Sequence, residues 1–396
     1  MTNGKYVPKR RFKEFESDGE WEQKLLSELA EVEGGGTPST VNPQYWDGDI
    51  DWYTPAEIGE SVFVDQSKRK ITVMGLDKSS AKILPIGTVL FTSRAGIGKT
   101  AILAREGCTN QGFQSIVPKE DLLASYFIYS QSNKLKQYGE RIGSGSTFVE
   151  VSGKQMSEMP LIVPSIFEQK QIGNYFQTID SLISLNQHKL DKLKNLKKAY
   201  LSEMFPAEGE RVPKRRFPGF EDEWEQRKVS DLFKITRGYV LAATKTEAHK
   251  SDRLPYPVYS SQTKDKGLMG FYSEYLYEDA ITWTTDGANA GEVNYRKGKF
   301  YCTNVCGVLL SKEVQADQMI AEAINNVAKK YVSYVGNPKL MNNVMAEIEI
   351  KIPSTNQERI KISQFFSTID TQITLQQQKL DKLNDLKKAY LNELFV

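Results

Sequence analysis

The sequence predicts an α+β protein in which two mixed α/β domains are separated by two long antiparallel coiled-coil helices, arranged as a circular, pseudo-twofold repeat. LDKLKNLKKAYLSEMF returns as LDKLNDLKKAYLNELF, and 20 of 30 positions are identical between residues 176–205 and 366–395. VPKRRF at 7–12 recurs at 212–217, and WEQ follows in both copies. Because the segment after the first helix repeats the segment that opens the chain, we expect the two chain ends to lie near each other.

These repeats divide the chain into six segments. The predicted order is an N-terminal repeat segment (1–24), a first mixed α/β domain (25–163), a long central helix (164–205), a linker repeat segment (206–227), a second mixed α/β domain (228–352) and a C-terminal long helix (353–396). Both domains are rich in β-branched and aromatic residues, which are interrupted by Gly, Pro and Asn and so favour short strands joined by turns. We predict strands at ITVMG, TVLFTS, SIVP, YPVYSS, AITWTT, KFYCTNVCGVLL and IEIKIP, and helices at 125–139 and 316–336.

The same signal begins each long helix. Just after a proline, Ser165 and Glu168 form an S-x-x-E capping box, and Thr355 and Glu358 form its counterpart in the second copy. At about 1.5 Å per residue, the first helix would be on the order of 55 Å long. A rod of this length can act as a spacer between two domains.

Apolar residues in the two helices follow a four-three spacing, which predicts a two-helix seam. We expect the helices to be antiparallel, because the domains between them must fit at opposite ends. Asn186 and Gln376 fall at corresponding positions, where a polar side chain can fix the register. Leu182, Leu196 and Leu386 lie off the seam and leave apolar surface for the helices of another protein. The predicted seam and partner residues are Ile183, Asn186, Leu190, Leu193 and Tyr200, with Ile373, Gln376, Leu380, Leu383 and Tyr390.

Composition excludes several protein classes. The net charge is +2, so the chain lacks the strong basic excess of a histone-like protein, although basic clusters such as Lys9 to Arg11 and Lys192 to Lys198 provide local positive patches. No apolar run has the length of a membrane span, and MTNGKYVPKRRF lacks the apolar part of a secretion signal, so we expect a cytoplasmic protein without membrane contact. Three cysteines are too few for a disulfide framework. We interpret CTNVCGVLL as one buried strand with both sulfurs on one face, and we predict no metal site.

Several catalytic motifs are incomplete. AGIGKT at 95–100 resembles the end of a phosphate-binding loop, but Ser93 stands where that loop requires glycine. NPQY at 42–45 differs by Gln44 from the element with which amino-methyltransferases hold a base, and the EIK sequence at 349–351 lacks the upstream Pro-Asp pair of a nuclease. Neither histidine has the neighbours of a general base. We therefore predict no catalytic residues in this chain.

The two domains share a faint common element of strand, glycine loop and strand. TVLFTSRAGIGKT followed by CTNQGFQSIVPK in the first domain parallels AITWTTDGANAGE followed by CTNVCGVLLSK in the second. This alignment matches Cys108, Thr109 and Asn110 with Cys302, Thr303 and Asn304. A frame that is repeated while its loop tips change suits the recognition of two different targets.

Polar and aromatic residues on these predicted loops are candidates for DNA contacts. Arg and Lys can bind guanine, Asn and Gln can bind adenine in the major groove, and Lys and Ser commonly bind phosphate. The same side chains are also ordinary surface and turn residues. The candidates are Trp52, Thr54, Ser93, Arg94, Lys99, Asn110 and Gln111 in the first domain, and Ser260, Ser261, Gln262, Lys264, Thr285, Asp286 and Asn289 in the second.

The chain resembles the specificity subunits of type I restriction and modification enzymes over nearly its whole length. The resemblance is carried by the repeat helices ending LKKAYLSEMF and LKKAYLNELF and by the linker FPAEGERVPKRRFPGFEDEWEQ. It is also carried by GGGTPSTVNPQYWDGDIDWYTPAEIG, SSAKILPIGTVLFTSRAGIGKTA and TNQGFQSIVP, which are similar to segments of many target recognition domains.

That resemblance implies a non-catalytic subunit with two target recognition domains, each of which reads one half of a bipartite sequence in double-stranded DNA. It implies that the repeat helices hold two methyltransferase subunits and that restriction subunits can join the complex. S-adenosylmethionine would bind to the methyltransferase partner, which flips an adenine and methylates it. ATP and Mg would bind to the restriction partner, and no cofactor to this chain. Two alternatives stay open: a fused methyltransferase or nuclease, and a coiled-coil adaptor that does not bind DNA.

Overall fold

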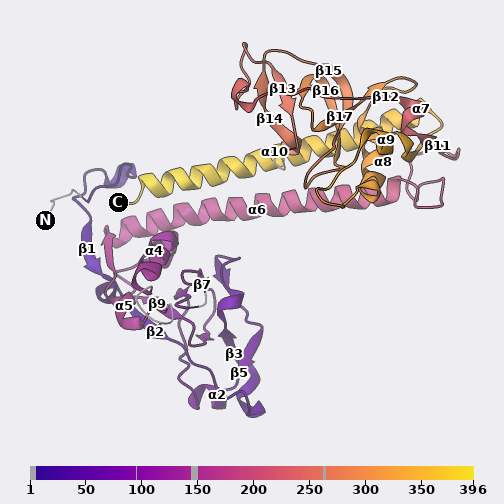
Figure 1. The fold of residues 1–396 in the computed structure, drawn as a ribbon. Helices are drawn as coiled ribbons and strands as arrows, with labels where there is room; N and C mark the ends of the chain where they lie inside the picture. Colours follow the sequence, from indigo (N-terminus) through magenta and orange to yellow (C-terminus); the bar gives the residue numbers. More distant parts are fainter. Residues whose placement is uncertain (1–5, 95, 144–149, 262–264) are drawn as a thin grey trace. The chain divides into compact units, whose positions relative to one another are not determined.

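The computed structural model describes residues 6–94, 96–143, 150–261 and 265–396, and the chain forms two compact units (Figure 1). Unit 1 comprises Met1–Asn186 and Lys379–Val396, and unit 2 comprises Gln187–Gln378. Each unit contains one α/β domain and one part of each long helix. The long helices are α6 (Ile166–Met204) and α10 (Asn356–Glu393).

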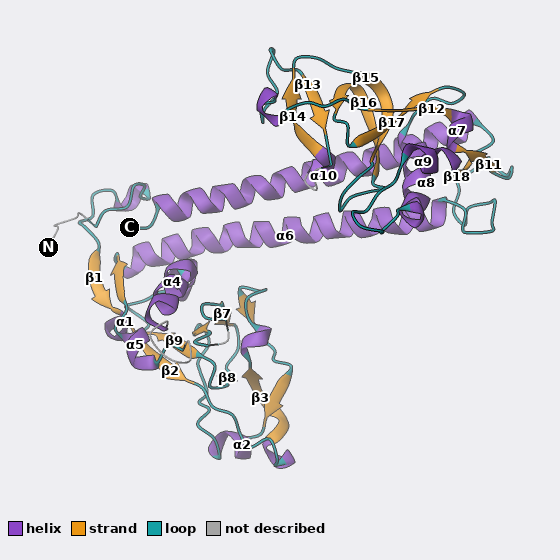
Figure 2. Cartoon of the chain, viewed as in Figure 1, coloured by secondary structure: helices purple, strands orange, loops and turns teal. Residues whose placement is uncertain are grey.

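The first domain, within unit 1, contains two sheets (Figure 2). The five-stranded sheet has the order β2 (Ala30–Gly34), β9 (Gln114–Pro118), β6 (Val89–Phe91), β7 (Thr100–Leu103) and β4 (Phe63–Val64). The three-stranded sheet has the order β5 (Arg69–Ile71), β3 (Trp46–Tyr53) and β8 (Cys108–Thr109). The helices of this unit are α1 (Leu26–Leu29), α2 (Val73–Asp77), α3 (Ser125–Ser130), α4 (Ser132–Gly143) and α5 (Gly153–Ser157), with 3-10 turns η1 (Lys13–Phe15), η2 (Pro43–Tyr45) and η3 (Pro55–Glu57).

The second domain, within unit 2, has one six-stranded sheet. Its order is β12 (Phe233–Arg237), β17 (Cys306–Ser311), β15 (Tyr277–Thr284), β16 (Val293–Cys302), β13 (Tyr256–Tyr259) and β14 (Leu268–Tyr272). The helices are α7 (Val229–Leu232), α8 (Gln318–Ala328) and α9 (Asn342–Glu347), with 3-10 turns η4 (Ala243–Lys245), η5 (Asp265–Gly267) and η6 (Lys329–Tyr331). The order β2-β9-β6-β7 of the first domain recurs as β12-β17-β15-β16, so the two domains share one frame.

A short antiparallel ribbon closes each domain where it meets the helices. In unit 1, β1 (Glu22–Leu25) pairs with β10 (Pro160–Val163), and in unit 2, β11 (Glu225–Lys228) pairs with β18 (Glu349–Ile352). The WEQ repeat begins β1 and β11, so the repeated sequence supplies the entry strand of both domains. The ribbon brings the two ends of each domain together and thereby makes the domain a separable insertion in the helical frame.

Aromatic residues of the repeats join the helices to these ribbons. In unit 1 the Trp21 ring lies 6.4 Å from that of Phe395, which in turn lies 5.7 Å from Phe176. In unit 2 the Phe205 ring lies 5.8 Å from Trp224 and 5.7 Å from Phe366. Each unit therefore packs the start of one long helix against the end of the other, which confirms the antiparallel arrangement.

The repeat segment 7–12 and the end of α10 lie together in unit 1, as the circular repeat predicts (Figure 1). The Arg10 amide donates to the Glu393 carbonyl at 2.9 Å, and the Arg10 guanidinium binds the Glu393 carboxylate at 2.6 Å. In unit 2 the Arg215 amide donates to the Glu203 carbonyl at 2.8 Å. The linker repeat thus makes the same contact with α6 that the N-terminal segment makes with α10.

A buried ion pair joins each VPKRRF segment to the first turn of a long helix. The Arg11 guanidinium donates to both oxygens of Glu168, at 2.8 and 2.6 Å, and Arg216 donates to both oxygens of Glu358, at 2.6 and 2.8 Å. These bonds raise the pKa of both arginines although burial opposes the rise. Two parallel charge-assisted bonds also fix the angle between the segments.

This pairing corrects one predicted detail of the capping boxes. The Ser165 and Thr355 hydroxyls each accept from the glutamate amide at 3.4 Å, as expected of the cap residue. The carboxylates of Glu168 and Glu358 instead face the arginines. A guanidinium satisfies both carboxylate oxygens at once, which one backbone amide cannot do.

Four predicted elements differ from the structure. ITVMG is mostly helix α2, because the Thr72 hydroxyl accepts from the Gly75 amide at 3.1 Å and caps it. CTNVCGVLL is not one strand: β16 ends at Cys302 and β17 begins at Cys306, with β15 between them in the sheet. The helix predicted at 125–139 breaks at Gln131, and that predicted at 316–336 ends at Ala328 before a 3-10 turn.

Among the described residues, no helix combines the length and the apolar character needed to cross a membrane.

We predict that Glu358→Gln lowers the free energy of unfolding by about 3 kcal/mol, because it leaves the buried Arg216 guanidinium without a counter-charge. Chemical denaturation would measure the change. The double variant Arg216→Met/Glu358→Leu should recover much of the loss, since no buried charge remains. Glu208→Gln is the matched control, because Glu208 binds Lys330 at 3.0 Å at an exposed position and should leave stability unchanged. Wild-type stability of Glu358→Gln would show that the ion pair does not hold the segment.

Candidate nucleic-acid interface

Four loops lie side by side at one end of the sheet in the second domain, and we call them the second loop row. They are residues 238–240 after β12, the turn 303–305 between β16 and β17, the glycine loop 285–292 between β15 and β16, and the hairpin 333–340. Backbone bonds join neighbours: the amides of Tyr239, Thr285 and Gly287 donate to the carbonyls of Cys302, Val305 and Pro338 at 3.1, 3.0 and 3.0 Å.

The first domain has a matching first loop row. It comprises residues 35–37 after β2, the turn 110–112 after β8, residues 92–94 and 96–99 of the glycine loop between β6 and β7, and residues 150–151 before α5. The amides of Gly36, Ser93 and Val151 donate to the carbonyls of Thr109, Gly112 and Ser93 at 2.9, 2.8 and 3.0 Å. The predicted strand, glycine loop and strand element is therefore confirmed in both domains.

Backbone bonding also corrects the predicted alignment of the two CTN sequences by one residue. The Asn110 amide donates to the Tyr53 carbonyl at 3.0 Å, whereas the amide in the same place in the second domain is that of Thr303, which donates to Tyr259 at 2.9 Å. Asn110 therefore corresponds to Thr303, and the exposed Gln111 corresponds to the exposed Asn304. Identical letters mislead here because the bond to the neighbouring strand, and not the residue type, fixes the register.

A glycine lets the first two loops of each row approach closely. A Cβ at Gly35 would overlap the Asn110 carbonyl oxygen, and one at Gly238 would overlap the Cys302 carbonyl oxygen. Both obstacles are backbone atoms of the adjacent turn, so they cannot move aside as a flexible side chain would. The two glycines thus set the spacing of the loops.

Two of the predicted contact residues lie in the core of the first domain. Trp52 is buried, its ring lies 5.0 Å from Trp46, and its indole N–H donates to the Gly36 carbonyl at 2.8 Å. The Ser93 side chain is also fully buried. Because they are buried, neither side chain can contact a ligand at the surface, and neither belongs to the candidate interface.

Other candidates shape the loops from within. The Thr54 hydroxyl binds Glu57 at 2.7 Å, the Asn110 side chain accepts from the Gly112 amide at 2.8 Å, and the Thr285 hydroxyl donates to Val305 at 2.9 Å. In the second row, Thr303 donates to the Ser260 hydroxyl at 2.9 Å, and Asp286 accepts from Asn337. These polar groups stabilise the turns on which the exposed residues stand.

The side chains that remain at the surface differ between the rows. In the first row Lys99 and Gln111 are exposed and Arg94 is partly exposed, 3.8 Å from Glu150. In the second row Asp286 and Asn289 are partly exposed, and so is Ser261, which follows β13 in the same domain. Gln262 and Lys264 lie outside the described residues.

Sequence reasoning missed several exposed residues of the second row. Tyr239 is 63% exposed, and the hairpin presents Tyr334 and Val335 at 69% and 93% exposure. Asn304 is exposed as well. The available signal was an aromatic residue within two positions of a loop glycine, in GYV at 238–240 and in YVG at 334–336.

The predicted seam residues lie on α6 and α10 and are buried to different extents. Asn186, Leu190 and Leu380 are buried, and the Asn186 side-chain amide donates to the Leu182 carbonyl at 2.6 Å. In unit 1 the Tyr390 ring lies 5.1 Å from Tyr175. The remaining predicted seam residues are partly buried, and they are Ile183, Leu193, Tyr200, Ile373, Gln376, Leu383 and Tyr390.

Exposed leucines recur at equivalent places on the two helices. Leu185 and Leu375 are 190 positions apart, as are Leu196 and Leu386, and all four are exposed. Unit 1 therefore has Leu185 and Leu386, and unit 2 has Leu375 and Leu196. In unit 2 a groove of about 500 Å³ adjoins this surface and is lined by Leu196, Tyr200, Phe217, Phe365, Ile369 and Gln372.

Comparison with known proteins gives one family. The model of the type I restriction modification DNA specificity domain matches residues 18–195 and 221–385, so it occurs once for each repeat. In overall fold the chain is similar to the crystal structure of a type I restriction-modification S subunit from M. genitalium, with a TM-score of 0.73, 15% identity, and coverage of 98% of this chain and 99% of that one.

Curated relatives are specificity subunits as well. The MjaIX specificity subunit of Methanocaldococcus jannaschii is 33% identical over 230 residues, which cover 55% of this chain and 53% of that protein. The EcoR124I/EcoR124II specificity subunit of Escherichia coli is 27% identical over 173 residues, 42% of each chain. The chain thus spans about half the length of these curated relatives.

We predict that Gly35→Ala and Gly238→Ala each destabilise the protein by about 1–3 kcal/mol, because the added methyl group meets backbone oxygen atoms that cannot retreat. Thermal unfolding would measure the loss. Gly19→Ala is the control, since a Cβ there has no neighbour within 4 Å. If all three variants unfold together with the wild type, the glycines do not set the loop spacing.

Proposed function

Since the chain belongs to the type I restriction modification DNA specificity family, we propose that it is the DNA-reading subunit of a type I restriction-modification complex. Each loop row would read one half of a bipartite sequence in double-stranded DNA. The observation that carries this proposal is one frame repeated in both domains with different side chains at the loop ends: the strand order and the loop bonds recur, while the exposed side chains differ.

The exposed residues at equivalent places in the two loop rows have side chains that can distinguish bases. Gln111 and Asn304 occupy the same place in the two rows, and each has an amide that can form two bonds with adenine in the major groove. At the neighbouring place Arg94 corresponds to Asp286, so one row has a cation where the other has an anion. A cation suits guanine or phosphate, whereas a carboxylate accepts from cytosine. We therefore infer unlike half-sites.

We further infer that methyltransferase subunits bind to the exposed leucine surfaces. Exposed apolar residues that recur on one face mark a protein interaction site. Because each unit has one copy of the surface, the chain would hold two methyltransferase subunits, and restriction subunits would join the assembled complex.

Chemistry would take place on the partners. The methyltransferase would bind S-adenosylmethionine, flip the adenine and transfer the methyl group, and the restriction subunit would use ATP and Mg. This chain would contribute the choice of sequence and no catalytic group, and it would act in the cytoplasm, where the DNA is. The long helices, about 58 Å for the 39 residues of α6, would act as the spacer between half-sites.

The first test of this function is methylation mapping in a host without other adenine methylation. Expression of the chain with its methyltransferase should produce one split, adenine-methylated motif, and Asn304→Ala should relax one half-site while Gln111→Ala relaxes the other. Loss of a bidentate base contact costs about 1–3 kcal/mol of discrimination. Asn326→Ala, at an exposed position of α8, is the matched control and should preserve both half-sites. Absence of any motif that depends on this chain, or methylation by the chain alone, would refute the proposal.

The second test counts methyltransferase subunits by light scattering of the purified complex. Leu196→Glu and Leu386→Glu should each remove one of two subunits, and the double variant should remove both, because a carboxylate on the apolar surface opposes burial. Asn195→Glu adds the same charge one residue away on α6 and should keep both. If the single variants retain two subunits, the leucine surfaces are not the docking sites.

A further inference from the structure

An aspartate on the helix seam of each unit binds the facing helix and the recognition domain at the same time. In unit 1, one Asp180 carboxylate oxygen lies 2.5 Å from the Lys387 amine of α10, and the other accepts from the Tyr126 hydroxyl at 2.9 Å. In unit 2, one Asp370 oxygen accepts from Lys197 of α6 at 2.7 Å, and the other accepts from the Gln318 side chain at 3.1 Å. In both units the lysine of the facing helix binds Oδ1 of the aspartate, and a side chain of the domain donates to Oδ2.

The helices supply the same residues to this contact, whereas the domains supply different ones. Asp180 and Asp370 are 190 positions apart, as are Lys197 and Lys387. The donors Tyr126 and Gln318 are unlike in chemistry, yet both stand in the first turn of the helix that packs on the seam, α3 or α8. Two domains of different sequence thus meet one requirement, which is a hydrogen-bond donor for Oδ2.

A second contact places the beginning of that domain helix. The Gln169 side chain of α6 accepts from the Ala124 amide at 3.1 Å, and Arg359 of α10, its equivalent in the repeat, binds the Asp317 carboxylate at 3.0 Å. Ala124 and Asp317 are the residues that precede α3 and α8. The two points are 11 residues apart on the long helix in both units, and together they define the angle of each domain helix on the seam.

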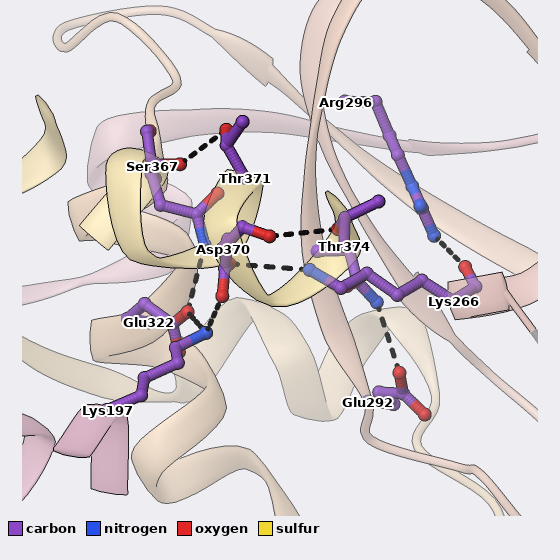
Figure 3. A network of polar contacts seen from close by, with 11 residues as sticks. Lys197, Lys266, Glu292, Arg296, Glu322, Ser367, Asp370, Thr371 and Thr374 are labelled. Atoms are coloured by element: carbon purple, nitrogen blue, oxygen red, sulfur yellow. Dashed lines mark hydrogen bonds and ion pairs between the residues drawn. The ribbon is translucent and has the colours of Figure 1, made fainter. Parts of the chain in front are cut away.

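In unit 2 the seam contact continues into the domain through Lys266 and Arg296 (Figure 3). Lys266 reaches Asp370 at 3.3 Å, and its carbonyl accepts from Arg296 at 2.6 Å. The buried Arg296 guanidinium lies 3.7 Å from the ring centroid of Tyr259, whose carbonyl accepts from the Thr303 amide of the second loop row at 2.9 Å. Lys197 also binds Glu322 of α8 at 2.5 Å, so charged groups of both helices and the domain converge.

The charged groups of this cluster are largely buried, so each one needs its partner at the correct position. Asp180 and Asp370 are 9% and 13% exposed at the side chain. Burial disfavours the charge of Lys197, yet Glu322 and Asp370 outweigh it and raise the pKa of the amine, so Lys197 stays charged. Buried charges are tolerated only when each has its partner in place. A domain that rotates on the helices would break the contact, so small rotations are opposed.

We propose that Asp180 and Asp370 are positioning residues that fix the register of each recognition domain on the helices and thereby fix the permitted spacer length between the two half-sites. This inference rests on the proposed function. Successive base pairs are separated by about 3.4 Å along DNA, so a modest rotation of a domain would bring its loops to a neighbouring base pair. Any domain exchanged into this frame would need a donor for Oδ2 at the place of Tyr126 or Gln318.

The test measures methylation by the complete complex on duplexes whose half-sites are separated by the natural spacer or by one base pair more or fewer. We expect Asp370→Asn and Tyr126→Phe to reduce the preference for the natural spacer by about tenfold or more, equivalent to about 1.4 kcal/mol. Both half-sites should still be read. Tyr126→Phe deletes one oxygen atom and keeps the ring, so it tests unit 1 even if Asp370→Asn folds poorly. Asp385→Asn, at an exposed position of α10, is the matched control and should keep wild-type spacing.

A purely structural role would lower the melting temperature without changing spacer preference, and that result would overturn the inference. Restoration of spacing by Gln318→Lys in the Asp370→Asn background would also count against it, since the carboxylate would then be unnecessary. Failure of the proposed function looks different, because the wild-type complex itself would then show no split motif.

Discussion

The buried Arg–Glu pairs are the constraint on which the rest of the structure depends. Arg11 with Glu168, and Arg216 with Glu358, tie each VPKRRF segment to the first turn of a long helix through two bonds apiece. Because one of these segments opens the chain and the other follows α6, the pairs close each unit at the same place. The ribbons β1-β10 and β11-β18 then leave each domain as an insertion whose ends are already joined. A domain held in this way can change its surface without disturbing the helices.

Within the domains, too, the backbone framework is fixed while the surface side chains can vary. Gly35 and Gly238 permit the close approach of neighbouring loops, and backbone bonds fix the register of those loops whatever side chains they have. Gln111 and Asn304, or Arg94 and Asp286, can therefore differ at equivalent places. The same holds where the domains contact the helices. A Tyr126 hydroxyl in one domain and a Gln318 amide in the other donate to equivalent aspartates, Asp180 and Asp370. Backbone and helix contacts set the position of the loops, and the exposed side chains at the loop ends can differ between the two domains.

Much of the fold could be predicted from the sequence. The circular repeat, the long antiparallel helices, the domain frame and the exposed Leu182, Leu196 and Leu386 all follow from periodicity and repetition, which are local or one-dimensional properties. The candidate site was predicted less well. Trp52 and Ser93 are buried, and the two CTN sequences match one residue out of step, because burial and register depend on which strands lie beside a loop.

Repetition along the chain is enough to predict that one helical frame is used twice and that two unlike domains are inserted into it. Which side chains reach the surface, and which partners the repeated charged residues bind, depends instead on how distant segments pack together. Glu168 and Glu358 show the reason: both stand three residues after a cap, where the sequence favours a bond to the helix's own backbone, yet an arginine distant in the chain offers two bonds in place of one. Contacts between residues far apart in the chain outweigh the local preference, and no local pattern records them.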